Sequence, residues 1–520
     1  MESALPPVPV KSQAAVRFVT FNVNGTKTLC NYHPWNKMKS FDKIFGYLFA
    51  DIITLQELKV QKDNLDHELN EIPNYRSFVT LATNRKGYSG VGVFVRIPAD
   101  EESDQIKSCL AVVHAEEGIT GYLKSSQSTT SYRDLNNIGG YPDISEVLAN
   151  EIDFQGRCVV LELGNMMVII SVYCFANSMG TEQGEFHRVL FLRCILERAE
   201  KLQQMGKTVV IMGDINVSRD LIDNEVYLRE GIADKSLIPP INNDGAHFEE
   251  ANKTAVLQFR TASQPRSLLN SFIKDKYNDS GILHDTFREH HGRVMRSYTV
   301  WNTLKNTRPL NIGSRIDLIL CSTALLNKFK KCEILPWLMG SDHCPVIADF
   351  EPDESFDSFP FSKQPLSFEA RYHYKTHNGC KIDSFFKSRS QGKITPTGVA
   401  KPPKSASYQY RSRKKQNPGY FKSSKNNFSD KEQQFFLDSY SDQEAKNKDG
   451  RSTDMESFKK ILSVAAGPPL CDHNEPCVLR VCKKESKNKG RKFWCCSRAP
   501  RPDENSNKLD EYRCNTFQWQ

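Results

Sequence analysis

Short, nearly continuous apolar runs recur through the first 350 residues of this 520-residue chain. Runs of this kind are typical of β-strands that are buried on both faces of a sheet. The clearest span residues 16–23, 51–55, 91–96, 158–162, 167–173, 208–212, 316–321 and 346–350. Amphipathic helical segments lie between them, the clearest at 185–204, and helices and loops are expected at 219–297. Residues 14–353 are therefore predicted to form one α/β domain, a four-layer sandwich of two packed β-sheets flanked by helices.

The composition changes after residue 353. Residues 354–467 are rich in Ser, Lys, Asn, Gln and Pro, and they carry too little apolar surface to offset the entropy cost of ordering. A disordered linker is the prediction. Six of the fifteen cysteines fall in the last fifty residues, which indicates a compact third domain at 468–520. This terminal cluster and the odd cysteine count favour a reducing compartment and a metal site over disulfides.

Charge is distributed unevenly along the chain. From residue 351 onward there are 32 Lys and Arg against 21 Asp and Glu, a net charge of +11, whereas residues 1–350 carry −3. A basic tail on an acidic front predicts that the tail attracts a polyanion. No window approaches the roughly 18 apolar residues that a membrane span requires, so we expect no membrane association. We also expect a monomer.

Most of the chemically reactive side chains in the front domain stand where an apolar strand ends or begins. They are Asn22, Asn24, Glu57, Tyr173, Asn177, Asp214, Asn216, Asp317, Asp342 and His343. Burying a carboxylate is costly unless it is paired or bound to metal, so charge at so many strand ends predicts one shared pocket. Each residue alone has an ordinary alternative as a helix cap, a turn residue or a packing group, and only the combination indicates a site.

The residue types in this pocket indicate a type of chemistry. Carboxylate and amide oxygens suit Mg²⁺ or Mn²⁺. The chain has no Ser–His–Asp pattern and no glycine-rich phosphate loop there. The set therefore favours metal-assisted attack of water on a phosphodiester.

The order of these motifs resembles the endonuclease/exonuclease/phosphatase superfamily, whose fold is two packed β-sheets between helices. Within it, the chain is similar to class II AP endonucleases of the exonuclease III type. The matching segments are Gly87–Val91, Gln155–Arg157, Gly213–Asn216, Asp285–Arg288, Tyr298–Trp301, Ser314–Asp317 and Ser341–His343. Ala115–Tyr122 and the insertion after it are closer to the fungal and vertebrate Apn2-like branch.

This resemblance implies a role for each pocket residue. Glu57 would ligate the metal, with Asn24 and Asp342 as further ligands and Asn22 orienting Glu57 or the water. Asp214, held by Asn216, would position and deprotonate the attacking water. His343, held by Asp317, would bond the scissile phosphate, which Tyr173 and Asn177 also contact. The full set placed around the metal is Asn22, Asn24, Glu57, Asp214, Asn216, Asp342 and His343.

The chain departs from these relatives at three places. Asn24 stands where many relatives carry Asp, and Tyr173-Cys174-Phe175 replaces a Tyr-x-Pro sequence. Val300 replaces a larger aromatic side chain of the AP-specialised relatives. A smaller wall beside the flipped sugar favours the acceptance of ordinary 3′ nucleotides, and with it 3′–5′ exonuclease action and the cleaning of 3′ ends.

The C-terminal domain carries a possible zinc site and a basic, aromatic surface. Cys471, His473, Cys496 and Cys514 would form a closed Cys₃His site for structural zinc, with Cys495 as the alternative to Cys496. Gly490–Phe493 and Phe517–Trp519 are similar to the GRF zinc-finger family, which implies this ligand set. Cations beside aromatic rings suit single-stranded DNA, and the alternative is a solvated face over a small aromatic core. The residues expected to bind DNA are Arg480, Lys492, Trp494, Phe517 and Trp519.

Two short linker segments indicate partners and location. Residues 379–387 resemble the peptide that binds the PCNA sliding clamp, with Ile382, Phe385 and Phe386 as anchors and Gly379 in place of the expected Gln. A chance hydrophobic cluster is the alternative. Arg411–Lys415 is typical of a nuclear localisation signal, although basic runs in such tails are also often only solvated charge.

Together these features predict a nuclear DNA repair phosphodiesterase, with a mitochondrial pool left open. It would cleave DNA 5′ to abasic sites and remove blocked or mismatched 3′ ends. One alternative is a phosphatase for inositol phosphates or an RNA deadenylase on the same fold. Another is a scaffold that binds PCNA and single-stranded DNA and whose nuclease activity is weak or lost. The intact set Glu57, Asp214, Asp317, Asp342 and His343 argues against such a loss.

Overall fold

The protein was analysed as a computed structural model. It describes residues 5–62, 65, 67–83, 85–124, 128–352, 360–361, 364–374, 471, 473, 475, 477–482, 492–498, 514 and 516–519. The chain divides into two compact units, Met1–Thr395 and Pro396–Gln520. Within the described residues, no helix has both the length and the apolar character needed to cross a bilayer.

The first sheet has six strands in the order β13-β14-β1-β2-β4-β3. Their bounds are β1 Val16–Asn22, β2 Ile52–Gln56, β3 Tyr75–Thr80, β4 Val91–Arg96, β13 Phe329–Ile334 and β14 Val346–Phe350. β1 runs parallel to β2, and the other neighbours are antiparallel. Every residue of β1, β2 and β14 is buried, which is the burial that their uninterrupted apolar runs require.

The second sheet also has six strands, in the order β5-β6-β7-β8-β12-β9. Their bounds are β5 Val112–Glu117, β6 Cys158–Leu163, β7 Met167–Tyr173, β8 Thr208–Asp214, β9 Leu283–Asp285 and β12 Asp317–Ser322. β7 runs parallel to β8, and the other neighbours are antiparallel. A short hairpin of β10 (Val300–Trp301) and β11 (Gly313–Ser314) forms a separate two-stranded sheet.

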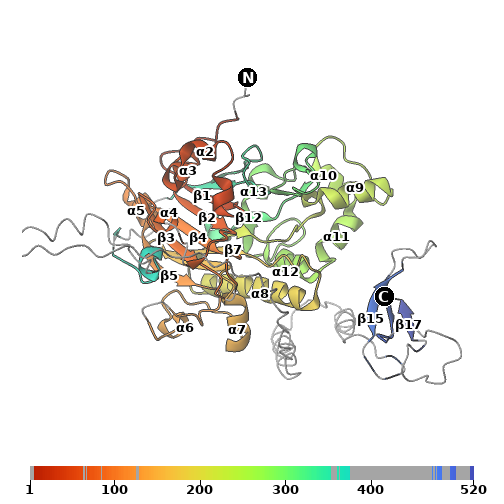
Figure 1. Ribbon diagram of the computed structural model, residues 1–520. Helices are drawn as coiled ribbons and strands as arrows, with labels where there is room; N and C mark the ends of the chain where they lie inside the picture. The colour runs from red at the N-terminus through yellow and green to blue at the C-terminus, as the bar shows by residue number, and fades with distance from the viewer. Residues whose placement is uncertain are drawn as a thin grey trace, which may run out of the picture. The chain divides into compact units, whose positions relative to one another are not determined.

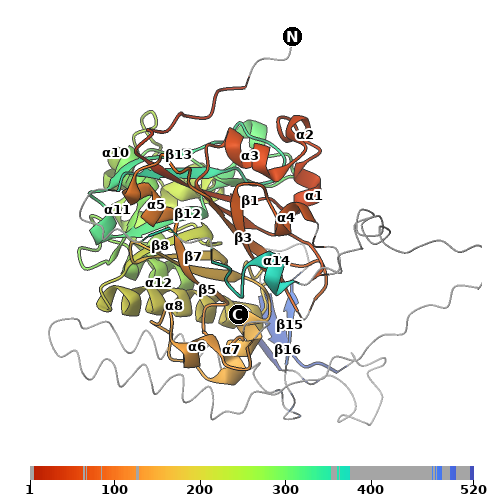
Figure 2. The same cartoon turned by 90° about the vertical axis from the view of Figure 1, so that its left-hand side faces the viewer.

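The two six-stranded sheets pack face to face. One continuous core joins them through residues such as Phe18, Val93, Leu161, Ile169 and Ile319. α2 and α3 lie on one outer side of the strands, and α8 and α12 lie on the other (Figure 1, Figure 2). The four-layer α/β sandwich predicted from the sequence is therefore confirmed.

The helices are short apart from α8. Their bounds are α1 Thr26–Leu29, α2 Trp35–Met38, α3 Phe41–Tyr47, α4 His67–Asn70, α5 Asp104–Leu110, α6 Tyr132–Leu135, α7 Glu146–Asp153, α8 Glu182–Gln204, α9 Glu225–Ala233, α10 Gly245–Ala251, α11 Lys253–Thr261, α12 Gln264–Phe272, α13 Thr286–His291 and α14 Ala370–His373. α8 begins where the Thr181 hydroxyl accepts the N–H of Gly184, a standard N-cap.

The polar stretch between β8 and β10 forms α9–α13, as helices and loops were expected there. Its small core contains Leu228, Phe248, Val256 and Phe259, among others. Buried ion pairs connect this stretch to the second sheet. The buried Arg315, just before β12, donates to both Asp223 and Asp285.

The segment 364–374, which the sequence places in the linker, packs onto the α/β domain within the first unit. Phe368 and Glu369 are buried, and Tyr374 joins the core beneath the first sheet. Arg76 of β3 donates to Glu369 Oε2 at 3.0 Å. The buried ring of Phe368 and the ion pair of Glu369 with Arg76 therefore hold residues 364–374 in place.

The second unit contains a three-stranded antiparallel sheet. β15 (Val478–Val481) pairs with β16 (Lys492–Cys495), and β16 pairs with β17 (Phe517–Trp519). A small core next to this sheet contains Cys471, Cys477 and Cys496, with Trp494 packed against it.

Candidate active site

Strand ends from both sheets meet at one place and bring the predicted polar residues together. Asn22 is the last residue of β1, and Glu57 follows β2 directly. Asp214 is the last residue of β8, and its register partner on β12 is Asp317. His343 lies three residues before β14. Because β1, β2 and β14 are neighbours in one sheet and β8 and β12 in the other, the site is built from both.

Asn22 connects the two sheets at the site. Its side-chain Nδ2 donates to Glu57 Oε1 at 2.9 Å and to Asp214 Oδ2 at 2.9 Å. Its Oδ1 accepts the backbone N–H of Asn24 at 3.1 Å. One buried amide therefore fixes the two carboxylates relative to each other.

Glu57, Asp214 and His343 form a group whose ligand atoms lie within 4.8 Å of one another. Asn24 Nδ2 donates to Asp342 Oδ1 at 2.9 Å, so Asp342 joins the site through Asn24. These carboxylate and amide oxygens are the donors that a hard divalent cation prefers. The residues present therefore fit a divalent metal.

Lys59 is a site residue that the sequence reasoning missed. Its ammonium lies 2.9 Å from Glu57 Oε2 and also donates to the side-chain oxygen of Asn24. Burial would raise the pKa of Glu57, but the bonds from Lys59 and Asn22 outweigh it and lower that pKa. The ammonium of Lys59 therefore lies between oxygens of Glu57 and Asn24, two residues that were expected to ligate the metal. The only signal in the sequence was a basic residue two positions after Glu57.

His343 and Asp317 form a buried pair. The Nδ1 of His343 lies 2.8 Å from Asp317 Oδ2, which makes Nδ1 the donor, and its Nε2 lies 3.9 Å from Asp214 Oδ2. Burial opposes the charge of the imidazolium, but Asp317, Asp214 and Asp342 outweigh it and raise the pKa of His343 to about 10. His343 is therefore a cation near neutral pH, with Nε2 available to a bound anion.

Asp214 has the properties of a base that operates near neutral pH. Burial and the neighbouring Asp317 raise the pKa of Asp214 to about 7, although His343 and Asn22 oppose the shift. The backbone N–H of Asn216 donates to Asp214 Oδ1 at 3.0 Å, as expected for a residue that holds it. Gly213, with φ of +145°, is required here because a Cβ would lie 1.9 Å from the Val172 carbonyl oxygen.

The side chain of Asn216 is committed to the neighbouring loop. Its Nδ2 donates to the carbonyl oxygen of Cys174 at 2.8 Å, and the main-chain carbonyl of Asn216 accepts from Arg188. These contacts support the role of Asn216 in holding Asp214. They support less directly the prediction that Asn216 lies around the metal.

Tyr173 lies beside Glu57. Burial raises the pKa of Tyr173, as do the charge of Glu57 and a hydrogen bond to it, so the phenol stays neutral and donates. The guanidinium of Arg157 lies over the Tyr173 ring at 4.6 Å and donates to the Tyr173 carbonyl at 3.2 Å. It also donates to the hydroxyl of Tyr88. Arg157 therefore connects the matching motif around Tyr88 to Tyr173.

Asn177 is engaged in the loop before α8. Its Nδ2 donates to Glu185 Oε2 at 2.9 Å, and its Oδ1 accepts the N–H of Thr181 at 3.1 Å. These bonds shape the start of α8. Among the described contacts, none joins Asn177 to Glu57, Asp214 or His343.

The main chain of Val300 forms an isolated antiparallel bridge with His343. Val300, which was predicted to form the wall beside the flipped sugar, is therefore adjacent to the site. Its side chain is half-buried.

The second unit gathers the four predicted zinc ligands. One ligand atom from each of Cys471, His473, Cys496 and Cys514 lies within 4.8 Å of the others. The Nδ1 of His473 lies 3.7 Å from the Cys471 sulfur and 3.6 Å from the Cys496 sulfur. Three thiols and one imidazole are a donor set that suits structural zinc.

The residues expected to bind DNA are only partly described. Arg480 and Lys492 are exposed, and the β15–β16 register places Arg480 opposite Phe493. Because side chains alternate along a strand, Lys492 falls on the other face of this sheet from Arg480. Trp494 packs against the cysteine cluster. The side chains of Phe517 and Trp519, and the clamp-type residues Ile382, Phe385 and Phe386, lie outside the described residues, as does Arg411–Lys415.

The fold and the site around Glu57, Asp214 and His343 define the class of protein. Residues 19–343 match the Endonuclease/Exonuclease/phosphatase family, and the chain belongs to that family. It is an enzyme of this hydrolase family.

Particular relatives resemble the chain over its whole length. It is 38% identical to DNA-(apurinic or apyrimidinic site) endonuclease 2 of Saccharomyces cerevisiae, over 98% of both chains. It is 25% identical to the protein of that name from Homo sapiens, over 97% of this chain and 99% of that one. The crystal structure of the Xenopus laevis APE2 catalytic domain matches with a TM-score of 0.50 and 26% identity, over 68% of this chain and 98% of that domain.

Proposed function

We propose that this chain is a DNA repair nuclease that hydrolyses the phosphodiester 5′ to an abasic site and also removes blocked or mismatched 3′ ends. The observation that carries the proposal is the group of half-buried Glu57 and buried Asp214 and His343, whose ligand atoms lie within 4.8 Å of one another. The similarity to AP endonuclease 2 relatives over nearly the whole chain supports DNA as the substrate.

Each side chain has a role that follows from its contacts. Asp214, with a pKa of about 7 and both oxygens held by Asn22 and Asn216, accepts the proton of the attacking water. His343, protonated and held by Asp317, donates from Nε2 to a phosphate oxygen as charge develops there. Neutral Tyr173 supplies a further donor.

Mg²⁺ or Mn²⁺ would be held by Glu57, with Asn24 and Asp342 as neighbours, and would supply positive charge to the phosphate and its bound water. Glu57 is kept ionised by Lys59 and Asn22, which prepares it for a cation. The remaining steps belong to the protein's own side chains.

A fluorescently labelled duplex with one abasic-site analogue tests the main activity. We expect cleavage on the 5′ side that EDTA abolishes and Mg²⁺ restores, and a recessed mismatched 3′ end should be trimmed under the same conditions. A phosphoinositide and a single-stranded poly(A) RNA serve as matched substrates for the two competing activities. Faster turnover of either one than of the abasic duplex would contradict the proposal.

Val300 is proposed to set the balance between these activities. A valine beside the His343 main chain leaves more room than an aromatic ring for an ordinary 3′ nucleotide. Val300→Phe should therefore lower the rate of 3′–5′ exonuclease action relative to abasic-site cleavage. An unchanged ratio of the two rates would remove this assignment.

The second unit is proposed to bind structural zinc and single-stranded DNA. The Cys₃His group supports the zinc, and the exposed Arg480 supports contact with a phosphate backbone on its face of the sheet, with Lys492 on the other face. Arg480→Glu should weaken binding to single-stranded DNA, measured by fluorescence anisotropy, without loss of zinc. Binding that does not change would exclude this surface.

The linker is proposed to bind PCNA and to direct the chain to the nucleus. These proposals rest on the sequence at Ile382, Phe385 and Phe386 and at Arg411–Lys415. Phe385→Ala together with Phe386→Ala should abolish PCNA pull-down and leave cleavage of the abasic duplex unchanged. Persistent pull-down would place the clamp-binding segment elsewhere.

A further inference from the structure

An arginine without a carboxylate partner lies beside the segment that carries Asp342 and His343. Arg308 belongs to the loop between β10 and β11 and is half-buried. It forms no ion pair with the residues that the structure describes. A buried guanidinium needs acceptors to replace its lost water, so its partners must be found elsewhere.

The partners of Arg308 are four main-chain carbonyls of one segment. Its Nη1 donates to Ser341 at 2.9 Å and to His343 at 3.4 Å. Its Nη2 donates to Pro336 and to Leu338, both at 2.9 Å. This segment runs from the end of β13 to the start of β14. One planar cation therefore fixes both ends of the stretch that presents Asp342 and His343.

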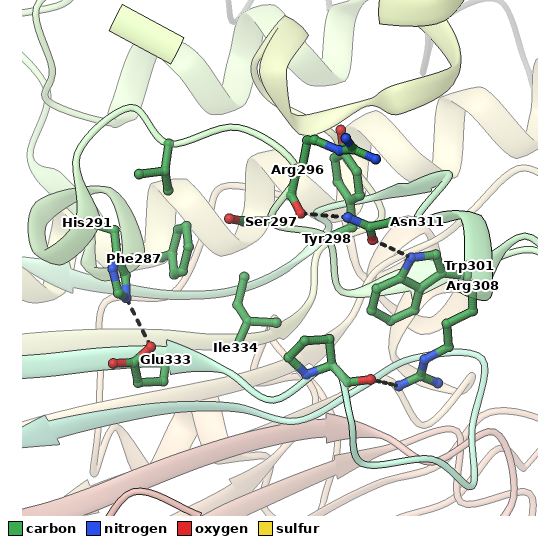
Figure 3. Close-up of a pocket in the computed structure, with 12 residues that line it drawn as sticks. Phe287, His291, Arg296, Ser297, Tyr298, Trp301, Arg308, Asn311, Glu333 and Ile334 are labelled. Atoms are coloured by element: carbon green, nitrogen blue, oxygen red, sulfur yellow. Dashed lines mark hydrogen bonds and ion pairs between the residues drawn. The ribbon is translucent and has the colours of Figure 1, made fainter. Parts of the chain in front are cut away.

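Trp301 packs its ring against the guanidinium of Arg308 and bonds the same segment. The guanidinium of Arg308 lies over the Trp301 ring, 4.3 Å from its centroid (Figure 3). The backbone N–H of Trp301 donates to the Asp342 carbonyl at 3.0 Å, and its indole N–H donates to Asn311. The hairpin β10–β11 and the catalytic segment are thus joined through Arg308 and Trp301.

We propose that Arg308 is a positioning residue for Asp342 and His343 and acts through the main chain. The inference rests on the proposed function, because it assigns a purpose to the placement of His343 Nε2. Catalytic groups have to be held within about 0.5 Å of their productive positions, and backbone contacts from a fixed guanidinium can do this. An ammonium cannot, because it lacks the planar array of five donors that spans several carbonyls.

The principal test combines substitution with chemical rescue. Arg308→Ala should lower kcat on the abasic duplex by ~10²-fold, with KM changed far less, because misplacement by about 1 Å can cost that much. Methylguanidinium at millimolar concentration should restore part of the lost kcat, whereas methylammonium should not. Arg308→Lys should remain impaired. Wild-type kcat in Arg308→Ala, or equal rescue by methylammonium, would overturn the proposal.

A control variant separates positioning from general damage. Arg76, on the edge strand β3 of the first sheet, is buried and donates to the main-chain carbonyls of Val112 and Gln364 as well as to Glu369. Arg76→Ala should keep kcat near the wild-type value and show no response to methylguanidinium. A loss of kcat in Arg76→Ala equal to that in Arg308→Ala would count against a specific role.

Hydrogen exchange provides a readout that does not depend on activity. In Arg308→Ala, amides of residues 335–344 should exchange faster, including Cys344, whose N–H donates to Thr299. Amides of β1 should exchange as in the wild type. If the wild type cleaved none of the substrates, the proposed function would fail, and faster exchange confined to 335–344 would still support the positioning role. Unchanged exchange in that segment would overturn it.

Discussion

The Nδ1 of His343 lies 2.8 Å from Asp317 Oδ2, and both side chains are buried. This pairing fixes the imidazole so that Nε2 is directed to Asp214, 3.9 Å away. Two carboxylates and one imidazole thus share a small volume, and the charge on each depends on the others. The electrostatics of the site can therefore be tested by changing one member.

Asp317→Asn should move both limbs of the pH–rate profile to lower pH. Asp214 must be deprotonated to accept a proton, so activity should rise through its pKa of about 7, and it should fall as His343 loses its proton near 10. Asp317 raises both pKa values, so its removal lowers both. The measurement is kcat/KM from pH 5 to 10.5, with circular dichroism confirming that the variant stays folded. If both limbs stayed at the wild-type pH, the assignment of the lower limb to Asp214 and the upper limb to His343 would be contradicted.

Asp214→Asn should reduce kcat by ~10²–10⁴-fold, because the proton acceptor is lost while the shape of the site is kept. Binding of the abasic duplex, followed by fluorescence anisotropy, should change little. Asn22 and Asn216 donate to different oxygens of Asp214, so the amide keeps one of these two hydrogen bonds, and a large loss of binding would point to a role other than proton transfer.

Lys59→Met should lower the Mg²⁺ concentration needed for half-maximal cleavage near pH 8. The ammonium of Lys59 bonds the oxygens of Glu57 and Asn24, and a divalent cation has to compete with it. Titration of the metal in wild type and variant makes the comparison, and Lys37→Met on α2 is a matched control. A higher Mg²⁺ requirement in Lys59→Met would mean that Lys59 supports the metal instead of opposing it.

Lys59→Met should also make Glu57 easier to protonate, because Lys59 lowers the pKa of that carboxyl. A carboxylate with a lowered pKa keeps its charge to more acid pH, so loss of the lysine should make the rate fall more steeply below the pKa of Asp214 than in the wild type. Rates between pH 5 and 7 at saturating Mg²⁺ measure this difference.

Cys514→Ser should remove one zinc ion per chain and weaken exonuclease action on long single-stranded regions. The four ligand atoms of its group lie within 4.8 Å of one another, and a hydroxyl is a poor replacement for a thiolate ligand. Native mass spectrometry of the full chain counts the metal. Cys482→Ser is the control within the same unit, and equal zinc content in Cys514→Ser and the wild type would exclude this ligand.

Arg315→Met should destabilise the first unit by ~3–5 kcal/mol, since it removes the cation shared by two buried carboxylates and leaves them only Arg288 and Arg219. Arg315 donates to both oxygens of Asp223 and of Asp285, at 2.7–3.0 Å. Urea unfolding followed by tryptophan fluorescence gives the free energy. Arg296→Met, at an exposed position nearby, should change it by less than about 0.5 kcal/mol.

The sequence predicts the interior of the two sheets better than their edges. All eight apolar runs form inner strands: β14, β1, β2 and β4 of the first sheet and β6, β7, β8 and β12 of the second. The four edge strands, β13, β3, β5 and β9, gave no such signal. β13 reads Phe-Lys-Lys-Cys-Glu-Ile, because an edge strand with an exposed face needs fewer apolar residues.

The candidate site was predicted in a similarly uneven way. The strand ends carrying Asn22, Asp214 and Asp317 were expected to share one pocket, and in the structure Asp214 faces Asp317 in the β8–β12 register while Asn22 bonds Asp214 from the other sheet. Lys59 and Arg308 could not be found from sequence. A lone lysine after a strand resembles any solvated charge, and the carbonyls that Arg308 contacts leave no trace in residue types.

The attachment of residues 364–374 affects how the enzyme can be divided. A chain cut after residue 353 would lose the buried Phe368 and would leave the guanidinium of Arg76 without its partner Glu369. An autonomous nuclease fragment should therefore retain everything through Tyr374.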